Sequence, residues 1–382
     1  MPARDVHASA LVIDAHADTP QRFVDEAWDF TGPLSSPANS RGMLDLATAR
    51  AGNLAAEFFA IWVDPGQVPA GRYAHRALTL IDGVHEQVRE HPRELALCSS
   101  PDEILAARTS GRFGVLMGIE GGHAIENSLA LLRAYHTLGV RYMTLTWANS
   151  NEWAESSTDL RSAGQPGLTP FGTEVVAEMN RLGMMVDLSH ASDRTFDDVL
   201  AATRAPVIAS HSSARALTHS PRNLTDDQLR ALAANGGLAM VNFYSAFIDE
   251  NYRLAWLAQR EERSQAHAAL EREYAVRNEP VPFHISNKVD REFAARIPRP
   301  PLSSLIDHFD HMIRVAGADH VGIGTDFDGI SALPEGIDSA ADLPRITAAL
   351  LARGHSAADL HKVLGGNLLR VFAAVQSFAS EP

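Results

Sequence analysis

Histidine and carboxylate side chains recur in this sequence directly after short apolar runs. The first case is His16-Ala17-Asp18, where an extended chain points both polar side chains to the same side. An imidazole beside a carboxylate suits Zn²⁺ or a similar ion. Four more such positions follow later in the chain: Glu120 between glycines, His190, His211 and Asp326. A lone His-x-Asp pair is a weak signal, but the combination indicates a metal site.

The apolar runs that precede these residues predict parallel β-strands. Near-continuous apolar character indicates strands that are buried on both faces. Eight such runs alternate with helical patterns, which predicts a closed (β/α)8 TIM barrel; a doubly wound open sheet is the alternative. The predicted strands are residues 10–15, 55–63, 114–119, 142–147, 184–188, 206–210, 238–244 and 320–324.

Helix signals lie between most of these strands. Residues 170–182, 192–203, 225–235 and 303–316 show the clearest helical patterns. Ser192 and Thr225 are expected N-caps, and Thr169 followed by Pro170 is typical of an N-cap with proline at the first helical position. No Gly-x-Gly-x-x-Gly opens a helix after a strand and no P-loop is present, so nucleotide binding has no support.

Ligand counting predicts two metal ions. His16, Asp18, Glu120, His190 and His211, together with Asp326, exceed the needs of one tetrahedral Zn²⁺. They suit two ions roughly 3.5–4 Å apart, with a water between them whose pKa is lowered. Neither lysine of the chain follows a predicted strand, so a carbamylated lysine cannot bridge the ions. Glu120 is therefore the expected bridge, with His16 and Asp18 on one ion and the two later histidines on the other.

Asp326 is expected to act on protons. It would orient the bridging water or hydroxide, accept a proton and pass it to the leaving amine. Considered alone, Asp326 would be expected only to cap a turn; its place at a strand end beside the predicted ligands favours the catalytic role.

Composition excludes several classes of partner. The chain has 382 residues, is 45% hydrophobic and carries a formal net charge of -14. That charge argues against nucleic acid and anionic membranes as partners. Cys98 is the only cysteine, which excludes an intrachain disulfide and fits a reducing compartment. With no signal peptide or membrane span recognised, we expect a soluble, cytoplasmic protein.

The chain is expected to form one domain over residues 1–382, with two irregular segments. Residues 20–50 form a Pro- and Gly-punctuated excursion after the first strand, and residues 246–300 form a helical insertion between strands seven and eight. Insertions after barrel strands lie on the catalytic face. This insertion is thus a lid or the contact of a homo-oligomer, or else a solvated surface helix. Residues 356–378 are expected to form one amphipathic helix.

Seven motifs in this order resemble the membrane (renal) dipeptidase family of metallopeptidases, peptidase family M19, within the amidohydrolase superfamily. They cover most of the chain: Val12-Ile-Asp-Ala-His-Ala-Asp-Thr19, Gly118-Ile-Glu-Gly-Gly122, Tyr142-Met-Thr-Leu-Thr146, Asp187-Leu-Ser-His190, Ser210-His-Ser-Ser213, Arg222-Asn223 and Gly322-Ile-Gly-Thr-Asp-Phe-Asp-Gly329. The resemblance implies two zinc ions per chain and hydrolysis of dipeptides with a free C-terminal carboxylate, including L-Xaa-D-Xaa. It also implies that Asp326 is the acid–base residue and that Arg222 holds the substrate carboxylate.

One position departs from the family pattern. Trp147 stands where mammalian members carry a histidine that contacts the substrate, and tryptophan cannot act as an acid. Its indole N–H can still donate a hydrogen bond, and stabilisation of a developing oxyanion is expected to rest on the metal, with Asn149 or Asn151 assisting. Trp147 and Tyr244 are expected to line the substrate pocket. A different substrate class, N-acyl amino acids or other small amides, stays open as the alternative to dipeptides.

Overall fold

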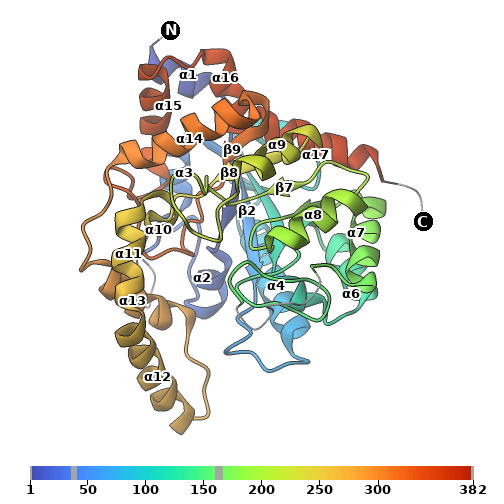
Figure 1. The fold of residues 1–382 in the computed structure, drawn as a ribbon, viewed down its shortest axis with the longest axis vertical. Helices are drawn as coiled ribbons and strands as arrows, with labels where there is room; N and C mark the ends of the chain where they lie inside the picture. The colour runs from blue at the N-terminus through green and yellow to red at the C-terminus, as the bar shows by residue number, and fades with distance from the viewer. Residues whose placement is uncertain (1, 36–40, 160–166, 380–382) are drawn as a thin grey trace.

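A ring of parallel strands forms the centre of the molecule in the computed structural model, which describes residues 2–35, 41–159 and 167–379 (Figure 1). Eight of its strands pair in the order β1 (Val12–Ala17), β2 (Leu54–Trp62), β4 (Phe113–Glu120), β5 (Val140–Thr144), β6 (Met185–Asp187), β7 (Ile208–Ala209), β8 (Leu238–Val241) and β9 (Val321–Ile323). Every pair is parallel. The eight-strand barrel predicted from the sequence is confirmed.

The ring closes just beyond β9, where the chain rejoins β1. Phe327 makes a parallel bridge with Ala17, and its carbonyl accepts a bond of 2.8 Å from the backbone N–H of Asp18. The N–H of Asp326 donates to the carbonyl of His16 at 3.0 Å. This closure places Asp18 and Asp326, which are more than 300 residues apart in sequence, beyond the ends of the adjacent strands β1 and β9.

Most helices lie on the outside of the ring (Figure 1). Along the chain they are α1 (Ala3–Ser9), α2 (Pro20–Asp25), α3 (Leu46–Ala51), α4 (Tyr73–Glu90), α5 (Pro101–Thr109), α6 (Leu129–Thr137), α7 (Pro170–Leu182), α8 (Asp193–Ala202), α9 (Asp226–Ala234), α10 (Ser245–Ile248), α11 (Glu250–Ala258), α12 (Arg260–Val276), α13 (Phe283–Ala294), α14 (Leu302–Ala316), α15 (Leu343–Ala352), α16 (Ala357–His361) and α17 (Asn367–Ser377). Among the described residues, none of these helices is both long and apolar enough to cross a bilayer.

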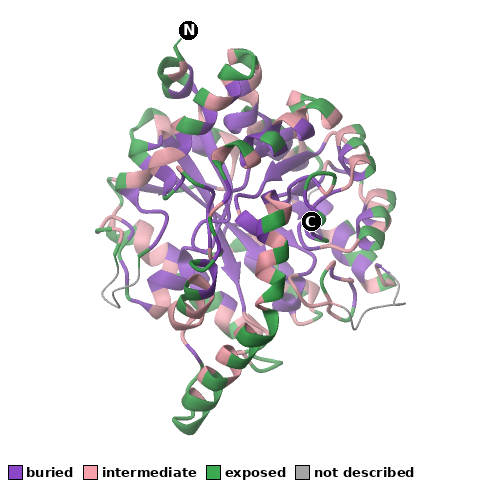
Figure 2. Cartoon of the chain, turned by 60° about the vertical axis from the view of Figure 1, so that its left-hand side comes forward, coloured by how far each residue is buried: buried purple, intermediate pink, exposed green. Residues whose placement is uncertain are grey.

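The barrel interior is filled by apolar side chains below the strand ends. Phe58, Leu116, Tyr142 and Met240 belong to this inner cluster, and the ring of Phe372 on α17 packs 6.1 Å from that of Phe58. The strands are therefore buried on both faces, as Figure 2 shows at the centre of the molecule. This packing explains why the strands read as apolar runs rather than as alternating patterns.

The tail differs from the single helix expected over residues 356–378. It forms α16 and α17, joined by the irregular turn η5 (Lys362–Gly366). The backbone leaves helical geometry at Gly365, where a Cβ atom would lie 2.2 Å from the carbonyl oxygen of Leu11. The helix breaks here because the chain must pass directly against the start of β1.

Further elements were absent from the expectations. The short strand β3 (Leu95–Leu97) pairs with β4 outside the ring, and both α2 and α3 begin inside the segment 20–50 that we expected to be irregular. Residues 36–40 of that segment lie outside the described residues.

Between β8 and β9 the chain forms α10 to α14. Helix α12 has no buried residue and projects away from the barrel, as Figures 1 and 2 show. Residues 280–290, around the start of α13, return to the mouth of the barrel. The expectation of an oligomer contact on this segment stays a prediction.

Candidate metal centre

The five predicted metal ligands converge at the carboxyl ends of the strands. His16 lies in β1 and Glu120 ends β4, whereas His190 and His211 follow β6 and β7 directly. Asp18, the fifth, follows β1, and each of the five residues is less than a tenth exposed. The structure therefore gathers side chains from four strands of the ring around one point.

Glu120 stands between the histidines. Its Oε2 lies 3.5 Å from Nε2 of His16, whereas its Oε1 lies 2.9 Å from Nε2 of His190 and 3.4 Å from Nε2 of His211. The two oxygens of one carboxylate thus face two separate sets of ligands. Asp18 completes the first set, with its Oδ2 3.6 Å from Nε2 of His16.

Hydrogen bonds behind the site fix the orientation of two imidazoles. The hydroxyl of Tyr142 donates to the carbonyl of Ala15 at 3.1 Å, so its oxygen is left to accept from Nδ1 of His16 at 2.8 Å. Nδ1 of His211 similarly lies 2.7 Å from the Ser210 hydroxyl. Both contacts turn the Nε2 atoms towards Glu120, the arrangement that supporting residues give to metal-binding histidines.

The electrostatics of the site favour a bound cation. Burial raises the pKa of Glu120, but the charge of His16 and the close approach of His16, His190 and His211 outweigh burial and hold this pKa well below its usual range. Burial and the neighbouring Glu120 raise the pKa of Asp18 well above its usual value. Carboxylates that are crowded together in this way without a cation are costly to ionise.

These residues fit a metal. Nε2 of His16 is buried and has no hydrogen-bond partner among the described residues. Ligand atoms of His16, Glu120 and His211 lie within 4.8 Å of one another, and so do those of His16, Asp18 and Asp326. Burial lowers the pKa of His190 to about 4 and that of His211 well below its usual value, so both rings are neutral, as ligands must be.

Asp326 lies at the edge of this cluster. Nδ2 of Asn242 donates to its Oδ2 at 2.8 Å. A Cβ atom on Gly329 would lie 2.0 Å from Oδ2 of Asp18 and 2.6 Å from Oδ1 of Asp326, so only glycine allows these carboxylates to share that space. Burial raises the pKa of Asp326 to about 6, in the range where a carboxyl group exchanges protons near neutral pH.

Arg222 is buried beside the centre. Its guanidinium donates to the carbonyl of His211 at 3.2 Å and to the Ser212 hydroxyl at 3.4 Å, whereas its Nε has no partner among the described residues. Burial lowers the pKa of Arg222 to about 10, which still leaves it charged at neutral pH. A buried cation with unused donors is suited to binding a carboxylate.

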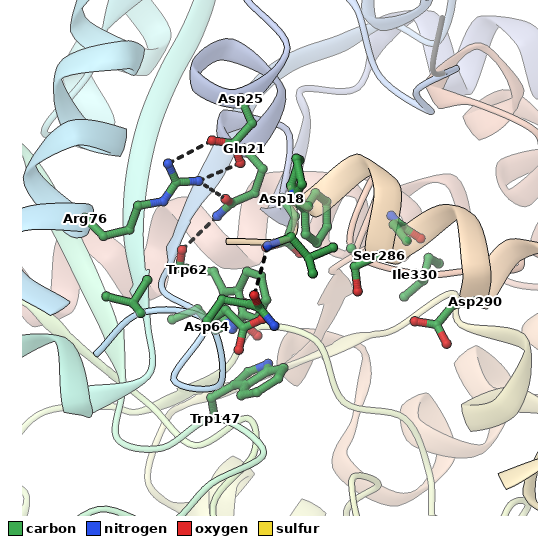
Figure 3. Close-up of a pocket in the computed structure, with 18 of the residues that line it drawn as sticks. Asp18, Gln21, Asp25, Trp62, Asp64, Arg76, Trp147, Ser286, Asp290 and Ile330 are labelled. Carbon is green, nitrogen blue, oxygen red and sulfur yellow. Dashed lines mark hydrogen bonds and ion pairs between the residues drawn. The ribbon is translucent and has the colours of Figure 1, made fainter. Parts of the chain in front are cut away.

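A cavity of about 950 Å³ opens above these residues. Asp18, Glu120, His190, Arg222 and Asp326 line it, and so do Trp147 and Tyr244; Figure 3 shows part of its wall. Asn149 and Asn151 are not among the lining residues. The Asn151 side chain instead donates to the carbonyl of Leu145 and accepts from the backbone of the following loop.

Sequence reasoning missed several residues of the site. Asn242 follows β8 directly, but the predicted strand 238–244 extended past it, so the strand-end rule did not single it out. Tyr142 supports His16 from within β5 and carries no such signal, whereas Ser210, which supports His211, stands at the end of β7. Trp62, the last residue of β2, pairs in register with Glu120 and lines the cavity, but its apolar character hid it within the predicted strand.

A (β/α)8 barrel with such ligands at its strand ends defines an amidohydrolase-like metallohydrolase fold. The chain matches the profile of the family described as "Membrane dipeptidase (Peptidase family M19)" over residues 1–381, and it belongs to this family. It is 34% identical to human "Dipeptidase 3" over 382 residues, which are 99% of this chain and 68% of the human protein. It is also 34% identical to the rat protein of the same name, over 96% of this chain and 65% of the rat protein. The chain thus spans about two thirds of the length of these curated relatives.

Two solved structures share the whole fold. The probable dipeptidase PvdM from Pseudomonas aeruginosa is 26% identical, with a TM-score of 0.81 over 99% of this chain and 98% of that one. A metallo peptidase from Rhodobacter sphaeroides, liganded with a phosphinate mimic of the dipeptide L-Ala-D-Ala, is 27% identical. Its TM-score is 0.76 over 96% of this chain and 99% of that one.

Proposed function

We propose that this chain is a zinc-dependent dipeptidase that hydrolyses dipeptides with a free C-terminal carboxylate, including L-Xaa-D-Xaa. The observation that carries the proposal is the position of Glu120, whose two oxygens face His16 on one side and His190 and His211 on the other. The phosphinate dipeptide mimic bound to the Rhodobacter relative supports the substrate class.

Two zinc ions would be held by this set of ligands. His16 and Asp18 would bind one, His190 and His211 the other, and Glu120 both. Such an ion pair polarises a scissile carbonyl and makes water nucleophilic near neutral pH. The two neutral histidines and the low pKa of Glu120 leave these ligands ready to bind cations.

The remaining steps belong to side chains of this chain. Arg222 pairs with the C-terminal carboxylate of the substrate and so sets its direction across the cavity. Asp326, oriented by Asn242, accepts a proton from the attacking water and delivers it to the nitrogen of the leaving amino acid. Both residues are buried in the wall of the cavity, next to the predicted ligands.

A second candidate function is hydrolysis of N-acyl amino acids or other small amides. Trp147 favours this function, because its indole stands where mammalian members carry a histidine and so changes the cavity wall that a substrate meets. The cavity of about 950 Å³ also lies near the upper end of the range for small-molecule sites.

The test combines metal analysis with a substrate panel. We expect two zinc ions per chain after reconstitution, and turnover of L-Ala-L-Ala and L-Ala-D-Ala but not of the C-terminally amidated dipeptides. Faster turnover of N-acetyl amino acids than of every dipeptide would favour the second function. Failure to hydrolyse any dipeptide while two ions are bound would overturn the first.

A further inference from the structure

We infer that an aromatic slot formed by Trp62, Trp147 and Phe283 receives the side chain of the N-terminal residue of the substrate, so that dipeptides beginning with an aromatic or large aliphatic residue are preferred. The inference rests on the proposed function and names the substrate class more closely. All three side chains line the cavity. The Trp62 ring lies 4.9 Å from that of Trp147 and 5.6 Å from that of Phe283.

The slot borders the metal centre. Trp62 pairs in register with Glu120 across β2 and β4, and the Trp147 ring lies 6.4 Å from the ring of His190. A group that lies against these rings is therefore next to the ligands on which the scissile carbonyl must lie. A side chain one bond away from that carbonyl is within reach of the slot.

Barrel geometry decides which end of the substrate meets the slot. Arg222 bonds to residues that follow β7, and β2, which carries Trp62, is four strands from β7 in either direction around the eight-strand ring. The carboxylate clamp and the Trp62 wall of the slot thus lie on opposite sides of the barrel mouth. A dipeptide that is anchored at Arg222 and crosses the centre directs its N-terminal residue towards β2.

The C-terminal side chain has a separate wall. Tyr244, Phe247 and Trp256 line the cavity on the Arg222 side, where the guanidinium of Arg222 lies 5.5 Å from the centre of the Phe247 ring. The Tyr244 ring lies 5.0 Å from that of Phe247 and 6.3 Å from that of Trp256. Each half of a dipeptide consequently meets its own aromatic surface.

The slot is held in shape before any ligand binds. The Gln21 side chain donates to the carbonyl of Trp62 at 2.7 Å, and Arg76 links Gln21 to Asp25, as Figure 3 shows. Phe283 is the first residue of α13, and hydrogen bonds hold the residues before and after it. The N–H of Val281 donates to Gln67 at 3.0 Å, and Asn287 donates to the carbonyl of Asp328 at 3.1 Å. Preformed aromatic walls gain affinity because little ordering is needed on binding.

The inference is tested with four matched dipeptides and two variants. For the zinc-loaded enzyme we expect kcat/KM for Phe-Ala to exceed that for Ala-Ala by about tenfold or more, because the benzyl group leaves water. Phe283→Ala should reduce this ratio by about threefold to tenfold. Phe378→Ala removes an exposed phenylalanine outside the cavity and should leave the ratio unchanged. Ala-Phe and Leu-Ala complete the set.

Several outcomes would overturn the inference. A wild-type ratio near one would do so, and so would a Phe283→Ala variant that lowers the preference for Ala-Phe instead, because the slot would then take the second side chain. If no dipeptide is hydrolysed, the proposed function fails and the slot is judged by calorimetry with phosphinate mimics of Phe-Ala and Ala-Ala. Equal Kd values for these two mimics would overturn the slot itself.

Discussion

His190 and Asp326 both adopt left-handed backbone conformations, with φ of 70° and 63°. Residues other than glycine rarely do so, and each such position costs free energy that the surrounding fold must offset. Here the conformation turns an imidazole and a carboxylate from the ends of β6 and β9 towards the same centre. Two residues with the same conformation at the predicted site indicate that their positions are set by the chemistry rather than by packing.

The role of Asp326 is tested by Asp326→Asn. The amide keeps the size of the side chain but cannot carry the proton, so kcat should fall by about 10²- to 10⁴-fold while zinc content stays the same. Asp64→Asn, at another carboxylate of the cavity, should retain most of the activity. Loss of zinc from Asp326→Asn would show instead that Asp326 is a ligand, as its closeness to His16 and Asp18 allows.

Arg222→Met tests the carboxylate clamp. Methionine fills much of the same volume but removes the buried charge, so KM for dipeptides should rise by about 10- to 100-fold with a smaller effect on kcat. Steady-state kinetics on free and C-terminally amidated dipeptides measure this, and the variant should lose the preference for the free acid. An unchanged KM would place the carboxylate elsewhere in the cavity.

Secondary-structure elements were predicted correctly where residues close together in the sequence determine their ends. Helix α7 has the bounds expected from the sequence because Thr169 caps it, accepting from the N–H of Gly172, and Pro170 occupies the first turn. Thr225 and Gln228 similarly form a capping box at α9. These contacts lie within four residues of each other, so the sequence contains all that determines them.

The predictions were wrong or incomplete for elements that depend on contacts between residues far apart in the sequence. The break at Gly365 exists because η5, between α16 and α17, packs against the start of β1, whose residues are over 350 positions away. The predicted metal ligands lie together because strand ends in a parallel barrel meet by topology. Phe283 and Trp62 were missed because an aromatic residue has no local signal that distinguishes a cavity wall from the core.

Helix α14 offers an element-scale prediction through His308. Nδ1 of this buried imidazole accepts from the N–H of Ala214 at 3.0 Å, and its Nε2 donates to the carbonyl of Ile248 at 3.2 Å. It thus ties α14 to the loop that leads to Arg222 and to the segment after β8. Burial lowers the pKa of His308 to about 4.

The lowered pKa of His308 determines how stability changes with pH. A histidine in the unfolded chain takes up its proton near pH 6.5, before the folded protein does, so the stability from neutral His308 is full above about pH 6.5 and is lost as pH falls towards 4. His308→Asn keeps an acceptor for the N–H of Ala214. It should reduce the slope of the unfolding free energy against pH by up to about 1.4 kcal/mol per pH unit. Urea unfolding from pH 7.5 to 4.5, with chelator present, measures it. An unchanged slope would contradict the prediction, and exposed His75→Asn is the control.

For the whole molecule, the barrel gathers negative charge at one end. Asp18, Glu120 and Asp326 are each less than a tenth exposed, and the chain as a whole carries a net charge of -14. An unfolded chain would solvate these carboxylates separately, whereas the fold brings them within a few ångströms. The cost of this arrangement is spread over the whole barrel because the residues come from β1, β4 and the segment after β9.

Removing metal should therefore lower the stability of the entire protein. Ions that bind only the folded state at 100 times their Kd contribute about 2.7 kcal/mol, which for a chain of this length corresponds to a Tm decrease of roughly 3 °C on chelation. Calorimetry with and without chelator, followed by zinc readdition, measures the shift. Glu120→Gln should lose most of this sensitivity because the bridge is weakened, whereas Glu178→Gln, far from the cavity on α7, should keep it. A wild-type Tm that stays constant while the zinc is shown to be removed would mean that the fold tolerates its crowded carboxylates without cations.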